Sequence, residues 1–169
     1  MSASADQLMR DLGQSIALGD ALVFNEQRCS RLMVDTHLAI DFEHVADEEL
    51  LQIYSVLGEP PAQGREQFYR ELLTANLFGN ATQGATLSFD PVFNQVLLTR
   101  TVELENATSP SFLKIVEAFV NGVEYWKTYI ADFAPDESES LGGANAANPK
   151  AERAPIATTS LAEHMMMRV

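Results

Sequence analysis

Apolar residues recur at helical spacing at both ends of the patterned part of the chain. Leu8, Leu12 and Ile16 lie four residues apart, and Ser4 with Gln7 has the form of a capping box. This pattern predicts a first helix over residues 4–19. Towards the C-terminal end of the patterned part, Ser109 and Pro110 are the predicted N-cap and first position of a last helix. An apolar stripe with spacings of four and three predicts that this helix is packed: Phe112, Val116, Phe119, Val123, Trp126, Ile130 and Phe133.

Between these helices the period changes to the alternation that is typical of strands. Three alternating runs occupy residues 31–35, 37–43 and 50–57, and the prolines that follow end the third, because proline cannot donate to a ladder. A second helix is predicted over residues 65–78, followed by strands over 86–89 and 95–104. The predicted class is therefore α+β, in the order helix, three strands, helix, two strands, helix. An antiparallel sheet is expected to be packed by the helices.

Composition separates this body from the rest of the chain. After Phe133 the sequence is rich in Ala, Ser, Asn, Gly and Pro and has no sustained apolar period. We therefore predict one domain over residues 1–133 and a disordered or weakly ordered tail over 134–169.

Charge and cysteine content narrow the range of partners. The formal net charge is −13, and such an excess of acid repels phosphate backbones and anionic membranes, so nucleic acid is not an expected partner. Cys29 is the only cysteine, which fits a reducing compartment. The first residues lack the pattern of an export signal, and no apolar run is long enough to span a membrane. A cytoplasmic protein without membrane insertion is predicted.

The common signatures of catalysis are missing from the sequence. No phosphate-binding loop is found, and His37, His44 and His164 lack the spacing of metal ligands; the first two are interpreted as solvated. Cys29 has no evident base, and the acidic run at 47–49 is interpreted as a solvated loop. We predict no catalytic residues, no metal and no cofactor. An enzyme with a dispersed site remains an alternative, which a deep pocket with convergent polar groups would favour.

Several stretches together resemble the class I chaperones of type III secretion, the family of the Tir and Yop effector chaperones. The resemblance extends from residue 4 to about residue 133 and includes Phe119 and Trp126-Lys127 of the last helix. Its most specific part is the helix with L-L-x-x-N-L, followed by the strand with G-A-T-L-x-x-D. The resembling stretches are residues 35–41 (DTHLAID), 50–58 (LLQIYSVLG) with Pro60, 68–77 (FYRELLTANL) and 84–90 (GATLSFD).

The resemblance implies a cytoplasmic homodimer that binds an extended N-terminal segment of one secreted effector and keeps it soluble and competent for secretion. Apolar patches and strand addition would hold the segment. The first helix and first two strands supply the candidate effector-binding residues: Leu8, Leu12, Ile16, Leu32, Val34, Leu38 and Ile40. The second helix supplies the candidate dimer contacts: Phe68, Leu72, Leu73, Asn76 and Leu77. Each of these apolar residues has a core role as its alternative.

An alternative hypothesis for the same fold is a regulatory module that binds a cellular protein unrelated to secretion. The sequence patterns predict the same elements for both functions. Identification of the bound protein would separate them.

Overall fold

A computed structural model describes residues 4–79 and 81–135, and it confirms the predicted α+β order. A five-stranded antiparallel sheet has the strand order β1-β2-β3-β5-β4, so β1 and β4 are its edges. The predicted tail lies outside the described residues from position 136 onwards. The main elements are α1 (Ala5–Ser15), β1 (Cys29–Val34), β2 (Leu38–Val45), β3 (Leu50–Gly58), α2 (Arg65–Asn76), β4 (Thr86–Asp90), β5 (Gln95–Glu103) and α3 (Ser109–Ala131).

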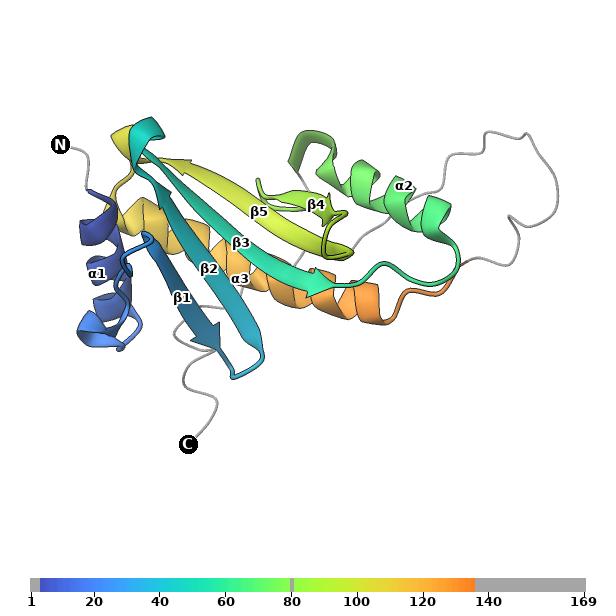
Figure 1. Cartoon of the computed structure of the whole chain (residues 1–169), viewed down its shortest axis with the longest axis horizontal. Helices are drawn as coiled ribbons and strands as arrows, with labels where there is room; N and C mark the ends of the chain where they lie inside the picture. Colours follow the sequence, from blue (N-terminus) through green and yellow to red (C-terminus); the bar gives the residue numbers. More distant parts are fainter. Residues whose placement is uncertain (1–3, 80, 136–169) are drawn as a thin grey trace.

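The core lies between one face of the sheet and α3. Figure 1 shows α3 running along the back of the sheet, with α1 at one end of the molecule and α2 at the other. The predicted stripe on α3 provides the fully buried Phe112, Phe119 and Trp126, which face inward residues such as Phe42 and Ile53. Burial of large aromatic and aliphatic side chains supplies most of the free energy that holds these two layers together.

The first helix is shorter than predicted, because the chain reverses after Ser15. Ala17 adopts a left-handed φ of 61°, and the 3-10 turn η1 (Gly19–Ala21) then packs against α1. A Cβ at Gly13 would lie 2.4 Å from the carbonyl oxygen of Gly19. Glycine at position 13 therefore permits a close backbone approach that the helical period does not reveal.

The other two helices differ from the prediction only at their ends. The second helix ends at Asn76 and continues as the 3-10 turn η3 (Leu77–Gly79), in which Phe78 has a φ of 59°. In α3 the N-cap is Thr108, one residue before the predicted Ser109, and its hydroxyl accepts from the Ser111 N–H. Because Ser111 also accepts from the Thr108 N–H, the two residues form a reciprocal capping box.

Candidate protein-binding surfaces

The seven predicted effector-binding side chains all lie in the core of the single chain. Each is at most 4% exposed, and together they join α1 and the first two strands to α3. Their core role is therefore evident, and their contact with a partner stays a prediction. The accessible groups near them are the main chain of β1 and the exposed side chains of Val23 and Met33.

The outward main-chain groups of the edge strand β1 are hydrogen-bonded at its start and, among the described residues, free of backbone partners further along. At Cys29, the N–H donates to Oδ1 of Asn25 over 2.9 Å, and the carbonyl accepts from the Asn25 N–H over 2.8 Å. These contacts show that the main chain of Cys29 points away from β2. Because this direction alternates along an antiparallel strand, the N–H and C=O groups of Arg31 and Met33 also point to the free edge. Within the described chain, no backbone group bonds to them there.

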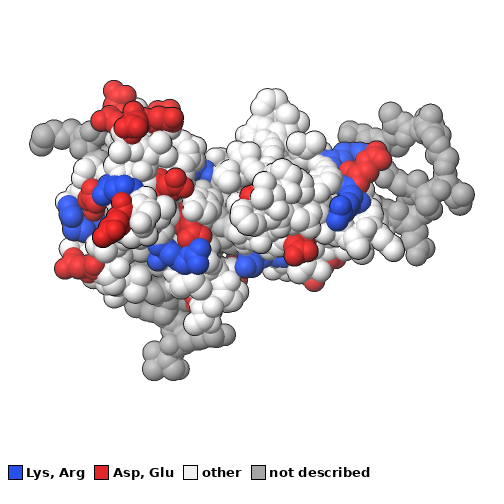
Figure 2. All heavy atoms as spheres, in the orientation of Figure 1, with Lys and Arg blue, Asp and Glu red and all other residues white. Residues whose placement is uncertain are grey.

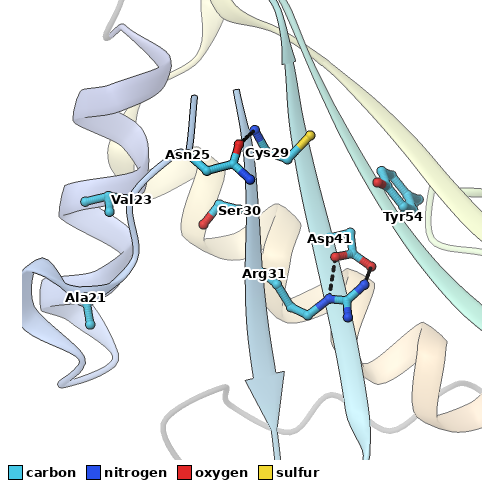
Figure 3. A pocket seen from close by; sticks show the side chains of 8 residues that line it. All are labelled: Ala21, Val23, Asn25, Cys29, Ser30, Arg31, Asp41 and Tyr54. Atoms are coloured by element: carbon cyan, nitrogen blue, oxygen red, sulfur yellow. Dashed lines mark hydrogen bonds and ion pairs between the residues drawn. The ribbon is translucent and has the colours of Figure 1, made fainter. Parts of the chain in front are cut away.

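A groove of about 540 Å³ lies where the chain before β1 separates from this edge. Figure 3 shows Ala21, Val23 and Asn25 along one side of the groove, with the strand and its outward side chains opposite. Leu22, between them, is buried and anchors the wall to the core. The groove is therefore a space beside open main-chain hydrogen-bonding groups, with the half-exposed Val23 at its border.

Polar side chains line the sheet side of this groove. The Arg31 guanidinium donates to both carboxylate oxygens of Asp41, from Nε over 2.6 Å and from Nη2 over 3.0 Å, and Asp41 raises the pKa of Arg31. Next to this pair, burial raises the pKa of Tyr54, and the charge of Asp41 adds to the effect. The phenol therefore stays protonated as a potential donor, and the surface suits a peptide with both polar and apolar side chains.

The predicted dimer residues lie on α2 and, for Leu77, at the start of η3, and they differ in exposure. Phe68 and Leu72 face the core, whereas Leu73 is 70% exposed and Leu77 is 60% exposed. Asn76 is used within the chain: its Nδ2 donates to the Leu87 carbonyl over 3.0 Å, and its Oδ1 accepts from the Leu87 N–H over 2.8 Å. This side chain thus ties α2 to β4, and a contact across a two-fold axis stays a prediction for it.

Besides these leucines, four exposed apolar side chains lie on η3, on β4 and on the turn after β4, and the sequence analysis did not identify them as exposed. Phe78 is 88% exposed, and Phe89, Val92 and Phe93 on β4 and the turn after it are also exposed. We call the six residues the α2–β4 patch: Leu73, Leu77, Phe78, Phe89, Val92 and Phe93. The available sequence signal was Phe93 between the strands predicted over 86–89 and 95–104, whereas the strand prediction had assigned Phe89 only to a sheet. Patches of this kind mark protein interfaces.

Charge is distributed unevenly over the molecule. Figure 2 shows acidic side chains gathered over the turn between β2 and β3, where η2 (Ala46–Glu48) lies, and few charges over β4. This confirms that residues 47–49 are a solvated loop. This area with few charges includes β4, which carries Phe89 of the α2–β4 patch, and a low charge density is typical of the core of protein interfaces.

A cluster around Arg28 joins three distant segments, and it includes His44, which was interpreted as a solvated residue and is half-buried with a hydrogen-bond partner in the chain. Arg28 donates to both carboxylate oxygens of Asp6 over 3.0 Å and, from Nε, to Nδ1 of His44 over 3.1 Å. Its Cζ lies 4.7 Å from the centre of the Phe24 ring, which also contacts His44. Arg28 lowers the pKa of Asp6, while burial and then Arg28 lower the pKa of His44. Sequence spacing gave no sign of this cluster.

Metal-ligating groups, hollows and long apolar helices are the remaining features of the described residues. Over residues 4–79 and 81–135, no group of three or more His, Cys, Asp or Glu side chains is placed to hold a metal ion. The hollows beside β1 and beside His44 are open and lined by a mixture of polar and apolar residues. Among the helices of this part of the chain, none is both long and apolar enough to cross a bilayer.

Solved structures with the same fold include proteins of type III secretion. A chain in the complex of HopA1 with SchA, a chaperone–effector complex, has a TM-score of 0.60 at 18% identity, covering 72% of this chain and 91% of that chain. A chain of the ExsC–ExsE complex has a TM-score of 0.63 at 16% identity, covering 77% and 97%. The structure of the Yersinia pestis type III secretion chaperone SycH with a fragment of YscM2 matches with a TM-score of 0.58 at 15% identity, covering 72% and 98%.

Sequence comparison extends over the same body. The Chlamydia pneumoniae protein CPj0713/CpB0740 is 24% identical over 121 residues, which are 72% of this chain and 92% of that protein. The profile of the Tir chaperone protein (CesT) family matches residues 7–127, from α1 to the second half of α3. The chain therefore belongs to the Tir chaperone protein (CesT) family.

Proposed function

We propose that this protein is a cytoplasmic chaperone of type III secretion that holds an N-terminal segment of a secreted effector in extended form. The observation that carries the proposal is the family match, which spans nearly the whole described body. The solved structures with this fold include chaperone–effector complexes, which supports the same kind of partner here. The work of such a protein is binding, so we infer that it needs neither catalytic residues nor a cofactor.

The open edge of β1 is the proposed main-chain contact for the effector. A segment that enters as an additional strand would bond to the free groups of Arg31 and Met33. Side chains on the outer face of the added strand would lie near Met33, and others would reach the groove beside Val23. The seven buried side chains of the predicted effector-binding set would then support this surface from the core side.

The α2–β4 patch is the proposed contact between two copies of the chain. It combines six exposed apolar side chains with few charges over β4, and it lies away from the edge of β1. An isologous dimer would bury the patch of each copy against that of the other. Two β1 edges would then remain accessible, one on each protomer.

Capture from the native cytoplasm tests the function. The tagged full chain is isolated, its bound proteins are identified by mass spectrometry, and the segment protected from proteolysis is mapped. We expect one dominant protein, protected near its N-terminus, whose export requires the type III apparatus. Recovery of a non-secreted cellular protein instead would favour the regulatory module, and protection of a folded domain would exclude the extended mode of binding.

A further inference from the structure

The wall of the β1 groove is held at two points. Leu22 is buried in the core at one of them, and Phe24 lies under the Arg28 guanidinium at the other. Val23, which borders the groove, lies between these two anchors and is exposed. The position of this side of the groove therefore depends on the contacts of Phe24 and Arg28.

Arg28 is itself fixed by groups from two other elements. Asp6 of α1 holds its guanidinium through a bidentate ion pair, and His44 near the end of β2 accepts from its Nε at Nδ1. Arg28 has a left-handed φ of 60°, a conformation that side-chain contacts of this kind can maintain. Nδ1 can accept only while the imidazole is neutral, because both ring nitrogens carry protons in the cation.

A second hollow, of about 320 Å³, gives His44 access to solvent. Arg28 from the chain before β1 contacts the ring, and the carboxylates that line the hollow with His44 are Asp6 of α1, Glu49 before β3 and Glu105 after β5. A proton on His44 would remove the acceptor for Arg28 and place two cations side by side. The carboxylates that line the hollow would attract the charged ring away from Arg28, and Asp6 would be shared between the two cations.

We propose that Arg28, Asp6 and His44 form a pH-sensitive clasp that positions the groove wall at residues 21–25, and that proton uptake by His44 releases this wall. Arg28 is a positioning residue in this arrangement, because it acts on the groove through Phe24. The inference that the clasp regulates effector binding rests on the proposed function. The conformational step itself does not depend on any effector.

A nuclear magnetic resonance titration of the full chain tests the clasp. The His44 ring and the amides of Val23 and Phe24 are followed from about pH 7.5 to about pH 5, a range that extends well below the ordinary imidazole pKa because the pKa of His44 is lowered in the fold. We expect the amides to shift with the same midpoint as the ring. His44→Gln should abolish that shift, while His37→Gln, at an exposed turn, should retain it. Asp6→Asn should loosen the wall already at the higher pH.

The outcomes separate the clasp from the chaperone function. Amides that do not follow His44, a shift that persists in His44→Gln, or a ring that stays neutral throughout would each overturn the clasp. With the mapped effector segment as probe, we expect weaker binding at the lower pH in the wild type and no such loss in His44→Gln. Equal affinity at both pH values would overturn the regulation, whereas no binding at any pH would overturn the proposed function and leave the titration result intact.

Discussion

Single residues in this fold act mainly by joining segments that are far apart in the sequence. Asn76 connects α2 to β4 through both atoms of its amide, and Arg28 connects α1 to the end of β2. The apolar period predicted many of the buried residues, because burial follows periodicity in helices and strands. It could not predict these polar contacts, since the partners are separated by 11 to 22 residues and share no motif. The prediction of His44 as a solvated polar residue accordingly missed its hydrogen bond to Arg28.

Asn76→Ala is expected to destabilise the protein by about 1–3 kcal/mol. The substitution leaves the N–H and C=O of Leu87 without their partners in a partly buried position, and an unsatisfied buried group costs about this amount. Urea unfolding of both proteins measures the difference. Asn106→Ala, at an exposed position, is the matched control and should change the stability by less than about 0.5 kcal/mol.

The lowered pKa of His44 predicts a loss of stability in mild acid. Below the ordinary imidazole pKa of 6.5, the unfolded chain binds a proton at this residue more readily than the folded chain does. The free energy of unfolding therefore falls as the pH falls below that value. Urea unfolding at several pH values should show this dependence in the wild type and a weaker one in His44→Gln. The same dependence in both proteins would mean that other groups cause it.

At the scale of elements, the order of helices and strands was predictable, while the ends of the helices were not. The stripe from Phe112 to Phe133 identifies α3 because its period is long and unbroken. The end of α1 depends on tertiary contact: the chain turns back so that Gly19 meets Gly13, a contact that no local pattern encodes. The exposure of Leu73 beside the buried Leu72 likewise depends on which side of α2 meets the sheet.

Gly13→Ala is expected to destabilise the protein although alanine favours helices. The intrinsic preference for alanine over glycine is about 1 kcal/mol, but the new Cβ would lie 2.4 Å from the backbone oxygen of Gly19 and force the segments apart. Thermal unfolding measures the sign of the effect. Gln14→Ala, at the exposed neighbouring position, is the control and should leave the melting temperature unchanged or raise it. A higher melting temperature for Gly13→Ala would show that η1 can move away from the new Cβ without a loss of stability.

Met33→Pro tests the open edge of β1. Proline removes an N–H that points away from β2, so the sheet should persist, as proline is tolerated on free edges. Effector binding should weaken, because an added strand would lose a main-chain donor. Met33→Ala removes the side chain but keeps the N–H and should weaken binding less. Calorimetry with the mapped effector segment measures both, and equal losses would assign the role to the side chain.

For the molecule as a whole, the two proposed binding surfaces lie on different edges of one sheet. The edge of β1 offers main-chain groups, and the α2–β4 patch beside the other edge offers apolar side chains. The sequence resemblance predicted both activities but assigned them partly to core residues, because similarity along a chain does not distinguish inward from outward side chains. Only the packed structure shows that Leu73 and Leu77 are accessible whereas Phe68 and Leu72 are not.

Leu77→Asp is expected to convert a dimer into monomers. At this 60% exposed position a carboxylate stays solvated in the single chain, so the monomer should fold. In the interface the carboxylate would be desolvated, which costs free energy of association. Light scattering over a range of concentrations measures the mass. Val23→Asp places the same charge on another exposed apolar residue and should leave the dimer intact. A Leu77→Asp protein that remains dimeric would exclude this part of the patch from the interface.

Asn25 occupies both outward main-chain groups of Cys29 through two hydrogen bonds. This pair of bonds, called the bracket below, has a consequence for self-association. An edge strand with a long row of free donors and acceptors is a template for identical strands, and sheets that expose one tend to grow into fibres. Here the bracket occupies the first residue of a six-residue strand, and only Arg31 and Met33 among the following residues direct main-chain groups outward. So short a template gives a copy of the chain little to bind, whereas a segment that also fills the neighbouring groove gains additional contacts. The bracket would thus favour occupation by a dedicated peptide over polymerisation of the protein with itself.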